Sequence, residues 1–97
     1  MVTLVVRPLA AADLGEAFGW YEQRSVSLGV ELLRAVDVCF DAIVASPLGY
    51  PVVYQRVRRI LLRRFPYAIF YIAGDDRVDI LACTHTRRHP RVWRRRT

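Results

Sequence analysis

The 97-residue sequence contains no lysine, so all fifteen of its basic side chains are arginines. It has only two cysteines, Cys39 and Cys83, which lack CxxC spacing and adjacent histidine ligands. We therefore expect two buried thiols, with no disulfide, no metal site and no cofactor. No apolar run approaches the roughly 20 residues of a membrane-spanning helix. The N-terminus MVTLVVRPL lacks a basic leader and a long apolar segment, so we expect a cytoplasmic protein without membrane contact.

Acidic side chains are scarce in the second half of the chain. Residues 1–48 carry three arginines against six acids, whereas residues 49–97 carry twelve arginines against three acids, giving about −3 and +9. A basic half of this kind predicts an anionic partner, either nucleic acid or an acidic protein segment. Arginine favours bidentate contact with phosphates or carboxylates, and a compositional bias of the source genome would give the same count.

The first half of the chain predicts one strand and two helices. Val2–Val6 is a short β-rich run closed by Arg7-Pro8, and a helical period follows it. Residues 25–29 interrupt this period with two serines and Gly29, and a second helical period then runs to Ser46. The two helices should form an antiparallel hairpin. Their acids fall mostly off the apolar stripes, where we expect a solvated face: Asp13, Glu16, Glu22, Glu31, Asp37 and Asp41.

The second half predicts a three-stranded antiparallel meander followed by a basic tail. The expected strands are Val52–Leu62, Phe65–Ala73 and Arg77–Thr84, and the tail should form a short helical turn after Pro90. A hydrophobic fraction of 54% is ample for a core, and without repeats or linkers we expect residues 1–97 to form one domain.

The register of the last two strands can be predicted from their turn. With a three-residue loop at 74–76 and an unusual backbone angle at Gly74, Phe70 would oppose Ile80 and Tyr71 would oppose Asp79. One face of the hairpin would then be wholly apolar, and the other would combine aromatic, acidic and titratable groups, with His85 just beyond. We expect the helices on the apolar face and function near the mixed face.

Several segments together resemble the RelE/ParE toxin superfamily, and its ParE branch in particular. These are LGVELL at the second helix, SPLGYPVV after it, the strand segment RRFPYAIFY and the closing HTRRHPRVW. The resemblance covers nearly the whole chain. It implies an α+β fold in which an N-terminal strand and an antiparallel helical hairpin pack on a meander-containing antiparallel sheet with a basic C-terminal tail.

The resemblance implies the toxin of a type II toxin-antitoxin system, neutralised by a cognate ParD-like antitoxin in a hetero-oligomer. The superfamily includes ribosome-dependent cleavage of messenger RNA and inhibition of DNA gyrase by binding. Carried over by motif, the ribonuclease positions fall at Arg59, Leu61, Ala68, Arg87 and Trp93. Leu61 and Ala68 cannot stabilise a phosphorane, and Trp93 cannot transfer a proton.

We therefore expect a gyrase-binding toxin that is not an enzyme. A RelE-like ribonuclease acting on ribosome-bound mRNA is the alternative, with Arg59, Arg87 and His85 as its catalytic candidates, and a non-toxic interaction module is a third reading. We favour a strand-end hydrogen-bonding role for His85 over catalysis. Trp93 should anchor the tail.

Two sets of residues are assigned to partner surfaces. The tail combines clustered arginines with an aromatic anchor, which suits salt-sensitive contacts to an anionic target. Target-binding candidates are Arg87, Arg88, Arg91, Trp93 and Arg94. Arginines and tyrosines next to the central strand suit an antitoxin segment with acidic and apolar anchors. Antitoxin-binding candidates are Arg63, Arg64, Tyr67 and Tyr71.

Overall fold

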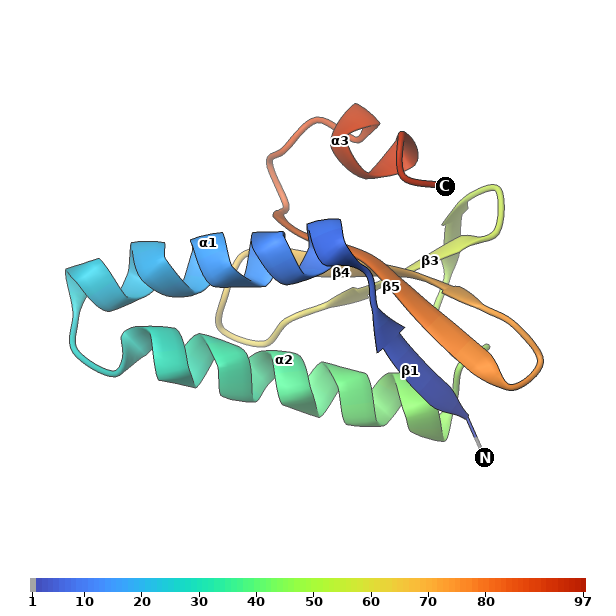
Figure 1. Ribbon diagram of the computed structural model, residues 1–97, viewed down its shortest axis with the longest axis horizontal. Coiled ribbons are helices and arrows are strands. Elements are labelled where there is room, and N and C mark those ends of the chain that lie inside the picture. Colours follow the sequence, from blue (N-terminus) through green and yellow to red (C-terminus); the bar gives the residue numbers. More distant parts are fainter. Residues whose placement is uncertain (1) are drawn as a thin grey trace.

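The computed structural model describes residues 2–97 and has the predicted α+β class, with a helical hairpin on one five-stranded sheet (Figure 1). The sheet order is β1-β5-β4-β3-β2, in which β1 runs parallel to β5 and the remaining neighbours are antiparallel. The sheet is therefore mixed. Its elements are β1 (Thr3–Val6), α1 (Pro8–Arg24), α2 (Leu28–Ala45), β2 (Val52–Tyr54), β3 (Val57–Leu61), β4 (Tyr67–Ala73), β5 (Arg77–His85) and α3 (Arg91–Arg94).

The connection between α1 and α2 is shorter than the sequence suggested. Gly29 was expected to interrupt the helical pattern, but it lies inside α2 and is buried against α1. A Cβ atom at this position would lie 2.7 Å from the Phe18 carbonyl oxygen, so glycine permits the close approach of the two helices. Glu22 accepts hydrogen bonds from the backbone N–H groups of Ser27 and Gly29, at 3.0 and 2.9 Å. Glu22 thus satisfies two backbone N–H groups at the start of α2 that have no partner within the helix.

The predicted strand Val52–Leu62 is two strands that form a hairpin of their own, so the meander has four strands. Val52 pairs with Arg58, and Tyr54 pairs with Val57. Gln55 turns the chain with a φ of 51°, a left-handed conformation that ends the first strand. The prediction was wrong here because the turn residues Gln55 and Arg56 include no Gly, Pro, Asn or Asp, so no turn signal separates the two strands.

The predicted register of β4 and β5 was also wrong. Ala73 pairs with Val78 and Tyr71 with Ile80, whereas Phe70 pairs with Ala82. Leu81 is therefore an extra residue in β5, and it forms a β-bulge. The loop before β5 differs too, because no glycine among residues 2–97 has a positive φ.

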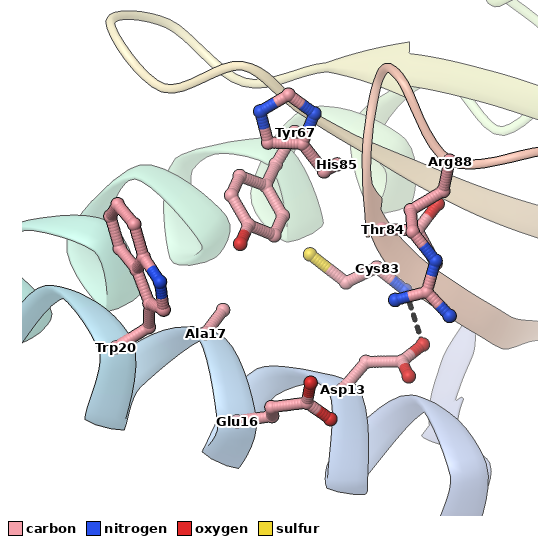
Figure 2. Close-up of a pocket in the computed structure, with 9 residues that line it drawn as sticks. All are labelled: Asp13, Glu16, Ala17, Trp20, Tyr67, Cys83, Thr84, His85 and Arg88. Carbon is pink, nitrogen blue, oxygen red and sulfur yellow. Dashed lines mark hydrogen bonds between the residues drawn. The ribbon is translucent and has the colours of Figure 1, made fainter.

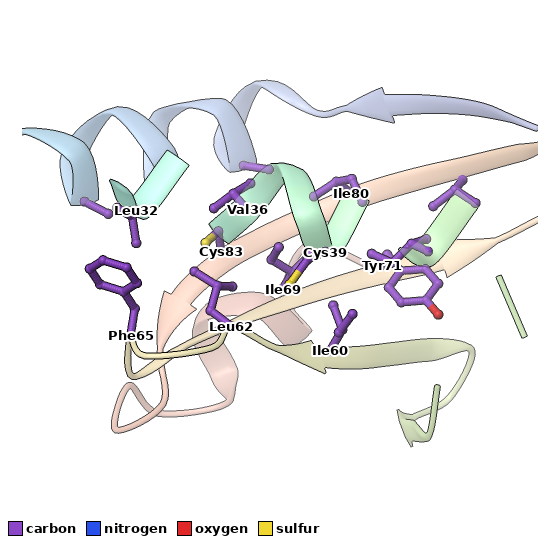
Figure 3. Packing of buried hydrophobic residues seen from close by; sticks show 14 residues of the cluster. Leu32, Val36, Cys39, Ile60, Leu62, Phe65, Ile69, Tyr71, Ile80 and Cys83 are labelled. Atoms are coloured by element: carbon purple, nitrogen blue, oxygen red, sulfur yellow. The ribbon is translucent and has the colours of Figure 1, made fainter. Parts of the chain in front are cut away.

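The hydrophobic core lies between the sheet and the two long helices, on the face we call the helix face (Figure 3). Ile69 and Tyr71 of β4 point to this face together with Ile80 and Cys83 of β5. The helices were expected over Phe70 and its alternating neighbours, and this expectation was wrong. The bulge places Ile80 and Cys83 on the same side although they are three residues apart.

The opposite side of the sheet, which we call the tail face, carries the short helix α3. Its smaller buried cluster contains Val57, Ala68, Phe70, Leu81, Ala82 and Trp93. The helical turn predicted after Pro90 is confirmed as α3. No helix within residues 2–97 combines the length and apolarity needed to cross a lipid bilayer. The sheet therefore has the two long helices packed on one face and α3 of the basic tail, residues 86–97, packed on the other.

Candidate functional site

Trp93 fixes the tail on the tail face. Its ring stacks on Phe70 with 4.2 Å between centroids and an interplanar angle of 14°, and only 5% of the residue is exposed. Tyr54 meets the same ring edge-on at 6.0 Å, and the guanidinium of Arg94 lies 4.6 Å from the centre of the Tyr54 ring. The predicted anchoring role of Trp93 is confirmed, and it holds α3 in one place.

Arg96 connects the tail to both α1 and β5. Its guanidinium contacts the carboxylate of Asp13 at 2.6 and 3.3 Å and donates to the Leu81 carbonyl at 3.1 Å. The carboxylate of Asp13 also accepts a hydrogen bond from the backbone N–H of Cys83, at 3.0 Å. β1 ends its pairing with β5 at Ile80, so the Asp13–Arg96 pair takes the place of a strand beyond that point.

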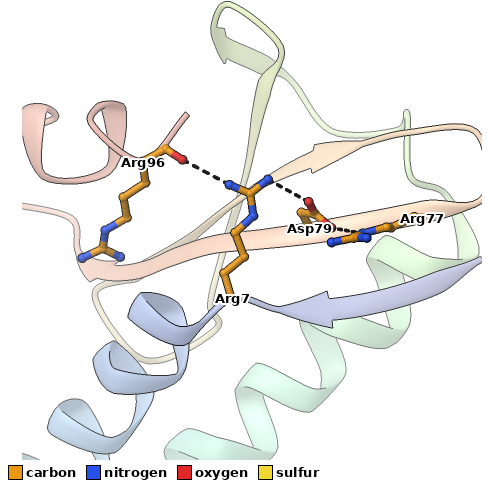
Figure 4. A network of polar contacts seen from close by, with 4 residues as sticks. All are labelled: Arg7, Arg77, Asp79 and Arg96. Atoms are coloured by element: carbon orange, nitrogen blue, oxygen red, sulfur yellow. Dashed lines mark hydrogen bonds and ion pairs between the residues drawn. The ribbon is translucent and has the colours of Figure 1, made fainter.

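A second group of charged side chains lies beside the end of β1 (Figure 4). Arg7 bridges two segments, because it donates to Asp79 at 2.7 Å and to the Arg96 carbonyl at 3.2 Å. Arg77 donates to the second carboxylate oxygen of Asp79 at 2.5 Å. The hydrogen bonds from Arg7 and then from Arg77 hold the pKa of Asp79 below its ordinary value.

A small cavity on the tail face is lined by four of the five residues at positions that correspond to the ribonuclease site, all except Arg87. Its volume is about 100 Å³. Arg59 and Arg88 bring positive charge to it, and the lining contains no carboxylate. Arg88, rather than the expected Arg87, reaches this cavity. The lining residues are Arg59, Leu61, Ala68, Phe70, Thr84, His85, Thr86, Arg88, Pro90 and Trp93.

His85 ends β5 and forms a hydrogen bond at the strand end, as predicted. Its Nδ1 accepts the backbone N–H of Arg87 at 3.1 Å, which leaves Nε2 as the nitrogen available to a ligand. Tyr67 packs edge-on against the imidazole ring at 5.5 Å. These two contacts orient His85, but neither comes from a carboxylate. His85 therefore lacks the acidic partner that orients a catalytic histidine.

A second cavity, of about 80 Å³, lies on the other side of His85, between α1 and β5 (Figure 2). Burial is the main cause of a raised pKa for Tyr67, and it raises the pKa of Cys83 to about 12, so the thiol stays protonated and unreactive. Trp20 is 48% exposed at the rim, and Arg24 stacks 3.3 Å from its ring centre. The sequence analysis did not identify Trp20 as a site residue, although this aromatic residue stands four positions after Glu16.

A larger cavity, of about 320 Å³, lies between α2 and the loop that joins β3 to β4, and we call it the α2 groove. Its floor is apolar, and Val38 there is 61% exposed. Arginines dominate its rim, where Arg64 makes a 3.5 Å ion pair with Glu31. Burial raises the pKa of the Cys39 thiol in the wall. The lining residues are Glu31, Arg34, Ala35, Val38, Cys39, Arg63, Arg64 and Phe65.

The four antitoxin-binding candidates do not form one surface. Arg63 and Arg64 line the α2 groove, whereas Tyr67 lines the cavity beside α1. Tyr71 cannot be a surface contact, because it is fully buried in the helix-face core and its hydroxyl donates to the Pro47 carbonyl at 2.7 Å. Its assignment was wrong because Gly74 hydrogen-bonds to Arg77 at the turn, and this one-residue shift places Val78 and Ile80 on the same face as Tyr71.

The acidic side chains of the two helices were expected on a solvated face, but Asp13 is largely buried. Its side chain is only 16% exposed and is held by Arg96 and the Cys83 N–H.

The target-binding candidates of the tail differ in burial, because Trp93 is buried and the arginines are exposed. The exposed ones are Arg87, Arg88, Arg91 and Arg94.

Comparison with known proteins gives one consistent family. Residues 4–90 match the family model described as the ParE toxin of the type II toxin-antitoxin system parDE. The chain is 32% identical over 79 residues to Toxin ParE2 of two Mycobacterium tuberculosis strains, CDC 1551 / Oshkosh and ATCC 25618 / H37Rv, covering 80% of this chain and 75% of each relative. It also resembles a solved structure titled chromosomal ParDE TA system from P. aeruginosa. That match has a TM-score of 0.64 and 22% identity, and it covers 88% of this chain and 96% of the other, which supports the fold.

Proposed function

Because this chain belongs to the ParE toxin family of type II toxin-antitoxin systems, we propose that it inhibits DNA gyrase by binding and that a ParD-like antitoxin neutralises it. Residues 1–97 would act as one toxin domain in the cytoplasm, within a toxin-antitoxin hetero-oligomer. We favour binding over RNA cleavage because of the residues that line the small tail-face cavity.

That cavity has positive charge but lacks the groups that would complete ribonuclease chemistry. Leu61 and Ala68 line it where the ribonuclease branch would place electrostatic partners, and Trp93 is committed to stacking on Phe70. Losing one preorganised partner typically costs about 100-fold or more in rate, so these replacements disfavour efficient cleavage. The RelE-like ribonuclease remains the alternative because Arg59, Arg88 and His85 lie together in the cavity.

The tail is the proposed contact with gyrase. Stacking of Trp93 and the ion pair of Arg96 fix α3, so the exposed arginines around it lose less freedom on binding than those of a free chain end. Guanidinium groups bind carboxylates and phosphates bidentately. The contact residues would be Arg87, Arg88, Arg91 and Arg94, with Trp93 as their support.

The α2 groove is the proposed contact with the antitoxin. Its apolar floor suits the nonpolar side of an amphipathic segment. Three arginines against Glu31 give its rim a net charge of +2, which favours acidic side chains on the incoming segment. Tyr67 lies outside this groove, so any role for it would require the antitoxin to extend across α1.

The decisive experiment measures DNA supercoiling by gyrase in the presence of the purified chain. We expect inhibition that the antitoxin reverses, and we expect Arg91→Ala/Arg94→Ala to weaken it about tenfold or more while Arg24→Ala, an exposed arginine on α1, leaves it unchanged. A translating-ribosome assay with primer extension runs in parallel. Codon-specific mRNA cleavage with unaffected gyrase would overturn the proposal in favour of the ribonuclease, and inactivity in both assays would favour a non-toxic interaction module.

The antitoxin surface is tested separately by calorimetry. Arg63→Glu/Arg64→Glu should weaken antitoxin binding at least tenfold, because two attractive charges at the groove rim become repulsive. Arg24→Glu carries a charge reversal elsewhere on the helical hairpin and should bind normally. Equal affinities of the groove variant and the wild type would exclude the α2 groove as the contact.

A further inference from the structure

A third group of arginines surrounds a cavity of about 200 Å³ at the edge of the tail face. The cavity lies where the β2–β3 turn, the start of β5 and the end of β1 meet, and Ile72 forms an apolar wall. None of the partner surfaces described above includes its arginines. The lining residues are Arg7, Arg56, Ile72, Gly74, Arg77 and Asp79.

The three arginines differ in how many of their N–H groups are already used. Arg7 uses both terminal nitrogens, one on Asp79 and one on the Arg96 carbonyl. Arg77 uses only Nε on Asp79, so its two terminal nitrogens remain available. Arg56 is exposed and has no hydrogen-bond or ion-pair partner within residues 2–97. Two guanidinium groups therefore offer free donors at one cavity.

Asp79 orients Arg7 and Arg77 without cancelling the positive charge of the cavity. Each of its carboxylate oxygens accepts a hydrogen bond, one from Arg7 and one from Arg77, so it fixes the side chains on both sides. Three guanidinium groups and one carboxylate leave a net charge of +2 on the lining. Asp75 and Asp76 belong to the adjacent turn but do not line the cavity.

We propose that this cavity binds a phosphomonoester group, carried by a nucleotide or by the 5′ end of a nucleic-acid strand. A phosphomonoester has a charge of about −1.5 to −2 at pH 7 and three acceptor oxygens, which matches the charge and the separate donors of the site. A carboxylate or a backbone phosphodiester has a single charge. A terminal group also enters a cavity more easily than a mid-strand phosphate, and the Ile72 wall can contact the attached sugar.

This proposal is tested without gyrase or antitoxin, so it can fail while the proposed function holds. Fluorescence anisotropy compares two short single-stranded DNAs that differ only in a 5′-phosphate or a 5′-hydroxyl. The wild-type chain should bind the phosphorylated strand about tenfold more tightly, because charge-assisted hydrogen bonds are among the strongest that proteins form. Arg56→Ala and Arg77→Ala should each reduce this preference toward unity.

The controls separate this site from the general attraction of a basic protein for DNA. Arg24→Ala removes the same charge far along the sequence on α1 and should retain the preference for the phosphorylated strand. Arg56→Ala decides the result if Arg77→Ala fails to fold, because the exposed side chain of Arg56 makes no hydrogen bond or ion pair within residues 2–97 that its removal would break. Asp75→Asn/Asp76→Asn should retain or increase the preference, since it removes nearby negative charge.

Competition identifies the source of the phosphate. Displacement of the labelled strand by a 5′-mononucleotide indicates a nucleotide site, whereas displacement only by a phosphorylated strand indicates a strand-end site, and either outcome supports the proposal. Equal binding of the two strands, or a preference that persists in Arg56→Ala, would overturn it. So would stronger competition by an aspartate-rich peptide or by inorganic phosphate, because these would assign the cavity to a protein carboxylate or to the free ion.

Discussion

The two faces of the sheet are held by different kinds of interaction. Among the described residues, the cluster between the sheet and the two long helices contains fourteen buried residues, whereas the cluster on the tail face contains six. Of the four ion pairs within residues 2–97, three involve Asp13 or Asp79 and surround the tail and its neighbouring strand ends. The helix face should therefore determine global stability, while the tail face should respond to changes in charge and pH.

The largest effect should come from the helix face. Leu32 is fully buried there, and Leu32→Ala should lower the free energy of unfolding by about 3 kcal/mol through lost burial and a new cavity. Urea unfolding followed by circular dichroism measures the change. Val38→Ala, an exposed position on the same helix, is the matched control and should change stability by less than about 0.5 kcal/mol. A small loss for Leu32→Ala would contradict the assignment of stability to this face.

On the tail face, Trp93→Ala should act locally. We expect a loss of about 2 kcal/mol, smaller than a core substitution of similar size gives, because α3 can detach while the helix-face core stays closed. Hydrogen exchange should show faster exchange for the backbone amides of residues 92–97 and unchanged protection in α2. Equal loss of protection in α2 would mean that the two faces unfold as one unit.

The Asp13–Arg96 pair should contribute less than the Trp93 stack. A double-mutant cycle of Asp13→Ala and Arg96→Ala should give a coupling free energy of about 1 kcal/mol, because both side chains are only 14–16% exposed and share charge-assisted hydrogen bonds. The coupling should fall only slightly in high salt, since buried pairs are weakly screened. A coupling of zero would show that the pair orders the tail without stabilising it.

The smallest effect concerns pH. The pKa of Asp79 is lowered in the folded state, so its stabilising contribution is present above the unfolded value of about 3.9 and is lost as pH falls through the folded pKa. The contribution should be at most about 1 kcal/mol, because Arg7 and Arg77 are 39% and 58% exposed. Urea unfolding between pH 5 and pH 2 should therefore show a steeper loss of stability for the wild type than for Asp79→Asn. Parallel pH profiles would contradict this.

The sequence predicted the elements of the helix face better than those of the tail face. Helical periodicity placed both helices within a few residues, because their apolar stripes pack against one continuous core. Alternation could not locate the extra residue Leu81, since a bulge leaves the composition of the strand unchanged. The face assigned to Tyr71 failed for a separate reason, because the turn pairs Ala73 with Val78 instead of Arg77 and shifts the register by one residue.

The tail site was predictable only in part. Trp93 is the one large apolar side chain in a basic segment, which was enough to predict an anchor. Its partner Phe70 depended on the strand faces, and the Asp13–Arg96 pair joins residues 83 positions apart in the sequence. No local pattern marks such a pair, because each member looks like an ordinary surface charge until the fold brings them together.

The use of Arg96 in place of a strand has a consequence for self-association. When the tail detaches, the Leu81 carbonyl loses the guanidinium of Arg96, while the Cys83 N–H keeps only Asp13 as its partner. The edge of β5 beyond β1 is then open to a strand from another molecule. The tail therefore protects this edge against misassembly as well as carrying its own charged surface.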